Sequence, residues 1–344
     1  MNKFTVLDKL ESGMIIGKDV IDKNTGVILI PKDTVLTTDH INKLSRHKVF
    51  AVMIKEEEIL ESLSNEGFSK EYSKVENRLD NIFEMVKKEG KIESEDIVNE
   101  IQGFVNEVSL ERDILTQMRL LRKKDDYTFD HSLGVSILAI TLGKWLGYSQ
   151  DKILELAIAG LFHDIGKLKI PDEILNKPGK LTPEEYNVMK KHSYYGYEML
   201  LKTNNFSENI LQGVLNHHEK MDGSGYPNGL ISNEIHEYAK IISICDIYHA
   251  LTTNRVYKEK DSPLRTADYL RQESFKSLDP YITRVFINNI SKFYIGNKVL
   301  LSDGTTGIIV YIYPQDETKP IVKVEDKFID FLKEQDVEII DIII

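Results

Sequence analysis

Residues 157–167 read AIAGLFHDIGK, and residues 210–219 read ILQGVLNHHE. Each stretch is an apolar run with helical spacing that ends in histidine followed by an acidic residue. Imidazole and carboxylate groups beside buried aliphatic side chains cost free energy unless hydrogen bonds, ion pairs or a metal ion compensate them. The two stretches therefore predict helices that end at a buried polar site.

More groups of the same chemistry lie on the other predicted helices. Helical spacing puts Asp164 on the inward stripe of Leu161, and Asp246 follows Ile242 at i+4. Five helices can thus each direct an imidazole or a carboxylate into one bundle core, as helical metal sites do. The candidate ligands are His131, His163, Asp164, His192, His217, His218 and Asp246.

Nitrogen and carboxylate ligands without thiolate suit Fe, Mn, Zn or Ni. An aspartate can bridge two ions, and a metal pair ~3.5–4 Å apart can hold a hydroxide and clamp a phosphoryl group. The alternative is a polar network with a purely structural role. The residues alone leave both interpretations open.

Basic and loop residues around these ligands indicate an anionic substrate. Lys167 follows His163 by one turn, and Arg255 and Lys258 follow the Asp246 helix. The turn DGSGYP at 222–227 comes directly after the histidine pair, so Tyr226 is expected beside the site. The simpler alternatives are solvated charges and a plain connection between helices.

Length and composition bound the remaining choices. At ~150 residues per domain, 344 residues predict two or three domains. The net charge of −11 argues against non-specific nucleic-acid binding. No stretch reaches the ~20 apolar residues that span a bilayer, and no signal peptide is recognisable. With Cys245 as the single cysteine, the sequence predicts a cytoplasmic protein with no nucleic-acid partner and no membrane insertion.

The pattern along the chain predicts four parts. Residues 1–55 form a small α+β module with a helix from Thr38, and residues 292–344 form a small β module. Residues 125–291 are helical, with one long helix expected from the Thr182 capping box through Met199. Residues 56–124 form a charged helical connector, with 14 acidic and 7 basic residues over 55–100. This segment is either a solvated connector or a helix pair that carries a signal or a dimer contact, so a homodimer or a signalling partner through the N-terminal half stays open.

Four motifs resemble those of the HD-GYP domain proteins, the bacterial cyclic di-GMP phosphodiesterases among the HD metal-dependent phosphohydrolases. They are HS at 131–132, HDIGK at 163–167, HHEKMDGSGYP at 217–227 and DIYHALTTNRVYK at 246–258. The resemblance covers about residues 125–290. It implies a mainly α fold, an all-helical HD-type metal-binding bundle at 125–291 flanked by the two small modules.

The resemblance also implies a reaction and a role for each residue. One metal ion would take His131, His163, Asp164 and Asp246, the other would take His192, His217 and His218, and Asp164 would bridge them. The two ions are expected to be Fe or Mn. Asp164 and Lys167 would be catalytic. Lys167 would contact the scissile phosphate or the leaving oxygen, Arg255 and Lys258 the other phosphate, and Tyr226 would shape the guanine-side pocket. The implied reaction is hydrolysis of cyclic di-GMP to pGpG, with a further cut to GMP left open, by a hydroxide that the two metals activate.

Two positions depart from the family pattern. His249 replaces an aspartate that many relatives carry, with no effect that the sequence reveals. Tyr127 stands where some relatives place a glutamate that binds a third metal, so two ions are expected. Three alternatives stay open: cyclic GMP-AMP as substrate, a non-catalytic cyclic-dinucleotide receptor, and a diiron oxygenase, which the GYP loop and the Arg255/Lys258 pair disfavour.

Overall fold

The computed structural model describes most of the chain. It covers residues 2–10, 14–22, 27–32, 34, 36–55, 66–89, 97–111, 114–115, 118, 127–203, 206–253, 261–334 and 336–343. Contacts group the chain into two compact units, one of residues 1–65 with 290–344 and one of residues 66–289. The four-part division of the sequence stays a prediction.

The N-terminal part of the first unit has its own small core. Strand β1 (Asn2–Val6) pairs antiparallel with β4 (Ala51–Lys55), and β2 (Val20–Ile21) pairs with β3 (Ile28–Ile30). A 3-10 helix, η1 (Leu7–Lys9), follows β1. Helix α1 (Thr38–Arg46) begins where the sequence predicts, because Thr37 and His40 cap it reciprocally. Ile16, Leu44 and Ile54 are fully buried between these elements.

The C-terminal part of this unit is a five-stranded antiparallel sheet in the order β8-β7-β6-β5-β9. A 3-10 helix, η4 (Ser291–Tyr294), precedes it. The strands are β5 (Lys298–Leu301), β6 (Thr306–Tyr313), β7 (Asp316–Val324), β8 (Lys327–Asp330) and β9 (Ile339–Ile343). The predicted small β module is thus confirmed.

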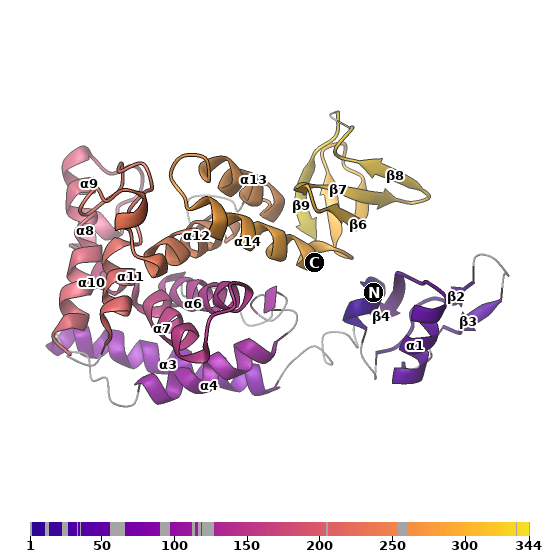
Figure 1. The fold of residues 1–344 in the computed structure, drawn as a ribbon, viewed down its shortest axis with the longest axis horizontal. Helices are drawn as coiled ribbons and strands as arrows, with labels where there is room; N and C mark the ends of the chain where they lie inside the picture. Colours follow the sequence, from indigo (N-terminus) through magenta and orange to yellow (C-terminus); the bar gives the residue numbers. More distant parts are fainter. Residues whose placement is uncertain are drawn as a thin grey trace. The chain divides into compact units, whose positions relative to one another are not determined.

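The second unit is built from helices joined by loops, and its described residues contain no named strand (Figure 1). The two short 3-10 helices are η2 (Ile165–Lys169) and η3 (Ser232–Glu234). The α-helices are α3 (Glu66–Glu89), α4 (Ile97–Leu110), α6 (Tyr127–Trp145), α7 (Gln150–Phe162), α8 (Asp172–Leu175), α9 (Pro183–Met189), α10 (His192–Leu201), α11 (Glu208–Asn216), α12 (Glu237–Thr252), α13 (Pro263–Glu273) and α14 (Pro280–Ile290).

Helices α6 and α7 lie side by side at the centre of this unit, and α12 and α11 contact them (Figure 1). Leu133, Val135 and Ile137 on successive faces of α6 are all fully buried, as expected for a helix that is apolar all round. Helices α3 and α4 bury Phe68 and Phe104 and contact α6 and α7, so one face of the charged segment belongs to the core. No helix among the described residues is long and apolar enough to cross a membrane.

The single long helix predicted from Thr182 through Met199 is wrong. The capping box of Thr182 and Glu185 is present, but α9 ends at Met189 and α10 begins at His192. The Nδ1 of His192 bonds the carbonyl oxygen of Met189 at 2.8 Å, and this side-chain bond competes with the backbone ladder at the break. The break matters because it makes His192 the first residue of a helix.

Candidate metal centre

Asp164 reaches the site from a turn and not from a helical stripe. Helix α7 ends at Phe162, so the prediction that Asp164 shares the inward face of Leu161 is wrong. Asp164 has φ −102° and ψ 3° and precedes η2. Two residues on, a Cβ at Gly166 would lie 1.9 Å from the carbonyl oxygen of His192, so only glycine lets this turn approach α10 so closely.

Three histidines of the site are oriented by the same backbone device. In each, Nδ1 lies within hydrogen-bond distance of the carbonyl oxygen three residues earlier. A carbonyl can only accept, so Nδ1 carries the proton in each neutral ring and Nε2 is left with its lone pair. The pairs are His163 with Gly160 at 2.8 Å, His192 with Met189 at 2.8 Å and His217 with Val214 at 2.7 Å.

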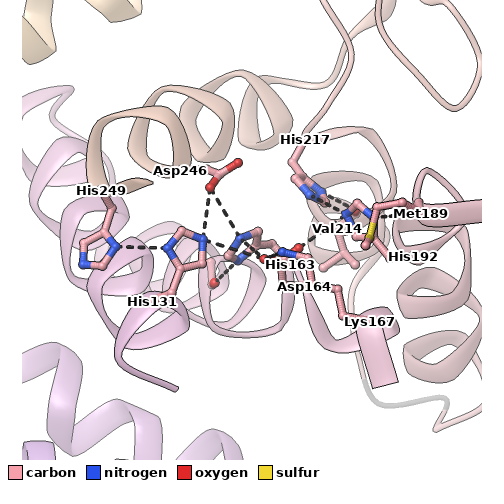
Figure 2. Close-up of polar contacts among 11 residues, drawn as sticks. His131, His163, Asp164, Lys167, Met189, His192, Val214, His217, Asp246 and His249 are labelled. Carbon is pink, nitrogen blue, oxygen red and sulfur yellow. Dashed lines mark hydrogen bonds and ion pairs between the residues drawn. The ribbon is translucent and has the colours of Figure 1, made fainter. Parts of the chain in front are cut away.

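The Nε2 atoms of His131, His163 and His192 lie near the two oxygens of Asp164 (Figure 2). Oδ2 lies 3.3 Å from His163 Nε2 and 3.7 Å from His131 Nε2. Oδ1 lies 3.4 Å from His192 Nε2. Asp164 is therefore shared by two groups whose ligand atoms lie within 4.8 Å of one another: His131, His163 and Asp164, and Asp164, His192, His217 and His218.

Asp246 joins the first group from helix α12. Its Oδ1 lies 3.1 Å from His131 Nε2 and 4.0 Å from His163 Nε2. The structure thus brings together all seven residues that the sequence predicts as ligands.

The donor set fits metal ions. Within the described residues, His163 Nε2 and Asp164 Oδ1 are buried and have no hydrogen-bond partner. The Nε2 atoms of His192 and His217 lie 3.4 Å apart, and both are acceptors because both Nδ1 atoms donate to carbonyls. Two facing lone pairs repel each other unless a cation lies between them or a proton is added. Bound divalent ions would satisfy both of these lone pairs and the two buried acceptors without a partner.

Burial and charge set the protonation of the cluster. Burial alone would raise the pKa of Asp164, but the Lys167 ammonium 2.5 Å away and the adjacent histidines outweigh it and hold the pKa well below its usual range. Asp246 behaves alike, since His131 outweighs burial and lowers its pKa. Burial lowers the pKa of His217, and it lowers that of His218 to about 3. Both carboxylates are charged and both histidines neutral at pH 7, the forms that bind metal.

The loop after the histidine pair lies against the cluster. The Tyr226 ring packs on the His218 ring at 4.7 Å between centroids and 31° between planes. Burial raises the pKa of Tyr226, so its phenol is neutral. Tyr226 therefore lies beside the second group, as the sequence predicts.

Glu219 is a residue whose role the sequence reasoning missed. Its side chain is buried and accepts the backbone N–H groups of Asn228 at 2.6 Å, Gly229 at 3.1 Å and Leu230 at 3.0 Å. The available signal was an acidic residue between a buried histidine pair and a glycine-rich turn. Glu219 fixes the far end of the loop that carries Tyr226.

Some predicted residues cannot be placed in the same way. Arg255 and Lys258 lie outside the described residues. Tyr127 begins helix α6, and nothing is described of its side chain. Asp130, one residue before His131, accepts a hydrogen bond from the Tyr72 hydroxyl of α3 at 3.4 Å. His249, the departure from the family pattern, hydrogen-bonds the His131 ring.

Comparisons with known proteins match the part of the chain that carries these residues. A family model described as HD domain matches residues 110–282. A cyclic di-GMP phosphodiesterase of Pseudomonas aeruginosa is 36% identical over 231 residues, 67% of this chain and 54% of its own. A 3'3'-cGAMP-specific phosphodiesterase of Vibrio cholerae is 38% identical over 176 residues, 50% of this chain and 40% of its own. The chain thus spans about half the length of these relatives.

A solved structure has a similar fold. It is described as an HDG"Y"P protein from Bdellovibrio bacteriovorus, is 18% identical, and has a TM-score of 0.55 over 85% of this chain and all of its own. This likeness confirms the mainly α fold with its helical HD-type bundle. The family match, the converging histidines and aspartates, and the HHEKMDGSGYP loop beside them show that the chain belongs to the HD domain family, within its HD-GYP group.

Proposed function

We propose that this protein is a metal-dependent phosphodiesterase that hydrolyses cyclic di-GMP to linear pGpG. The observation that carries the proposal is Asp164, which is shared by two groups of buried ligand atoms directly beside the GYP loop. A shared carboxylate between two adjacent cation sites is the arrangement of two-metal phosphoesterases. The names of the relatives support the substrate class.

In this proposal two divalent ions occupy the centre. The nitrogen and carboxylate ligands suit Fe, Mn, Zn or Ni, and the resemblance to the HD-GYP proteins favours Fe or Mn among these. His131, His163 and Asp246 hold one ion, His192, His217 and His218 hold the other, and Asp164 bridges them. When bound, such a pair activates water and neutralises charge on a phosphodiester.

The other residues bind and orient the substrate. The Lys167 ammonium, held 2.5 Å from Asp164 Oδ2, faces the scissile phosphate and stabilises charge that develops on it in the transition state. The neutral Tyr226 phenol lines the guanine side of the pocket. Arg255 and Lys258 bind the second phosphate. Lys167 is only half-buried, so its side chain is partly accessible to solvent.

Turnover by loaded protein tests the proposal. Protein purified without oxygen and loaded with Fe(II) or Mn(II) should convert cyclic di-GMP to pGpG, and chromatography over time would show whether GMP follows. Cyclic di-GMP bound without any product would contradict the enzyme and leave the receptor. The Asp164→Asn variant is the matched inactive control.

Cyclic GMP-AMP is the second candidate substrate, because a relative of similar identity carries that name. The same assay run with equal concentrations of both dinucleotides decides between them by their kcat/KM values. A higher kcat/KM for cyclic GMP-AMP would replace cyclic di-GMP in the proposal.

Two further parts of the proposal concern the setting of the enzyme. A reducing cytoplasm fits the single, buried cysteine, Cys245. A homodimer or a signalling partner would contact the N-terminal half. Size-exclusion chromatography with light scattering tests the dimer directly.

A further inference from the structure

His249 lies beside His131 of the candidate metal centre, on helix α12. It is 2% exposed, and its Nδ1 is 3.0 Å from the Nδ1 of His131. At this distance one ring donates a proton and the other accepts it. If the Nε2 of His131 is a ligand, its Nδ1 must carry the proton, so the Nδ1 of His249 is the acceptor.

This contact differs in kind from the others in the centre. His163, His192 and His217 are each oriented by a backbone carbonyl of their own segment. The Nδ1 of His131 bonds a side chain 118 residues away, on another helix. The residue that contacts the His131 Nδ1 can therefore be changed without altering the backbone.

The structure makes room for this second ring. Gly134 lies one turn after His131 on α6, and a Cβ there would be 2.1 Å from the Nε2 of His249 and 2.4 Å from its Cδ2. Any side chain at 134 would displace the imidazole. Gly134 and His249 thus form one packed arrangement behind the His131 ring.

We propose that His249 is a positioning residue that accepts the Nδ1–H of His131 and thereby aims the Nε2 of His131 at Asp164 and Asp246. The inference rests on the proposed function, since it takes His131 as a metal ligand. Its consequence is local. Loss of the acceptor should weaken the ion held by His131, His163 and Asp246 and spare the ion held by His192, His217 and His218.

Three variants of the full chain test whether residue 249 acts as a hydrogen-bond acceptor or only fills space. In His249→Asn the side-chain oxygen replaces Nδ1, so the acceptor remains. In His249→Gln the oxygen sits one bond further out, towards Gly134, and in His249→Leu it is absent. Mn(II) affinities measured against a chelator give a readout independent of turnover, and unfolding of the metal-free forms checks that they fold.

We expect His249→Asn to bind two ions nearly as the parent does. His249→Gln and His249→Leu should bind one of the two ions about 10–100-fold more weakly, the usual effect of losing a hydrogen bond to a ligand. Gly134→Ala should cause the same selective loss by displacing the ring. If His249→Leu does not fold, the difference in Mn(II) affinity between His249→Asn and His249→Gln tests the proposal.

Equal affinities in the Asn and Gln variants, or a loss shared by both ions, would overturn the role of His249. If the parent protein turns over cyclic di-GMP with two ions bound, such a variant result refutes only the positioning role of His249 and leaves the proposed function intact. A parent protein that binds no metal would overturn the proposed function and this inference together.

Discussion

Asp164 owes its position to the end of a helix, and both of its oxygens are needed there. One oxygen faces His131 and His163, and the other faces His192. In Asp164→Asn one oxygen becomes an NH2 group, which repels a cation. We expect both ions to bind more weakly and turnover to fall by roughly 10³-fold or more, on the scale of lost transition-state contacts. Elemental analysis and kinetics check this, and full metal content with near-normal turnover would contradict it.

Lys167 should act on the rate and not on binding. Its ammonium lies against Asp164 and is proposed to face the scissile phosphate, on which charge develops in the transition state. Lys167→Ala should therefore lower kcat roughly 10²–10³-fold with little change in KM. Lys169→Ala is the matched control, because the ammonium of Lys169 lies over the Tyr195 ring. A rise in KM with kcat unchanged would refute this role.

Arg255 should show the opposite pattern. It is proposed to hold the phosphate that does not react, so Arg255→Ala should raise KM and leave kcat nearly unchanged. Steady-state kinetics on metal-loaded protein measures both constants. A fall in kcat alone would exchange the roles of Arg255 and Lys167.

Single residues also mark what the sequence can predict. The seven proposed ligands could be predicted because they stand in motifs, end apolar runs or lie on predicted helices. The bond between His131 and His249 could not, because it joins residues 118 positions apart and depends on the space that Gly134 leaves. The sequence shows that His249 is unusual, but only the packing shows what it contacts.

At the scale of elements, the loop after the histidine pair depends on Glu219. Glu219→Gln replaces one acceptor oxygen with a donor that faces backbone N–H groups. Leaving a buried hydrogen-bonding group without its partner costs about 1–3 kcal/mol of stability. We expect a KM raised several-fold and unchanged metal affinity, because the loop and not the ligands should shift.

Glu234→Gln is the control for this change. Glu234 also accepts a backbone N–H, from Ile231 at 2.9 Å, but it is exposed. The Glu234→Gln substitution should therefore leave KM unchanged. Metal loss in Glu219→Gln would show that the loop and the cluster are not separable.

Glu155 links three helices and predicts a pH dependence of stability. From α7 it accepts bonds from Tyr238 of α12 at 2.7 Å and Asn209 of α11 at 3.0 Å. Burial alone would raise the pKa of Glu155, but hydrogen bonds from Ser207, Asn209 and Tyr238 outweigh it and lower the pKa below its ordinary value of 4.5. Its contribution is therefore complete above pH 4.5 and is lost as pH falls through the folded pKa.

Unfolding of Glu155→Gln against pH measures this contribution. The variant should be about 1 kcal/mol less stable at pH 7, and the difference should shrink below pH 4.5. In a Tyr238→Phe background the effect of Glu155→Gln should be smaller. A difference that stays constant down to pH 3 would show that charge plays no part.

Helix boundaries show where local rules suffice. The starts at Thr38 and Pro183 follow from capping residues next to them in the sequence. The ends at Phe162 and Met189 could not be predicted, since His163 and His192 bond carbonyls of the preceding turn with their rings. Hydrophobic periodicity alone predicts that a helix continues through such positions, whereas in the structure the helix ends where a histidine ring bonds the carbonyl.

At the scale of the molecule, the ions should contribute to the stability of the second unit. The proposed ligands come from α6, α10, α12 and the ends of α7 and α11, so two ions would cross-link five helices. Removal of the ions by a chelator should lower the Tm. A ligand present at 100 times its Kd stabilises the folded state by about 2.7 kcal/mol, and each bound ion should act in this way. We expect two ions per chain by elemental analysis. Three would show that a further carboxylate near Tyr127 takes part, and an unchanged Tm would show that the ions do not brace the bundle.

The first unit is made from both ends of the described chain. Lys9 bonds the carbonyl oxygen of Phe293 at 3.3 Å, and the backbone of Phe4 lies against Gly296. Synthesis proceeds from the N-terminal side, so residues 1–65 emerge before residues 66–289 and meet residues 290–344 only after these have been made. Every proposed ligand, from His131 to Asp246, leaves the ribosome before that meeting. The metal centre can therefore assemble while the first unit is still incomplete.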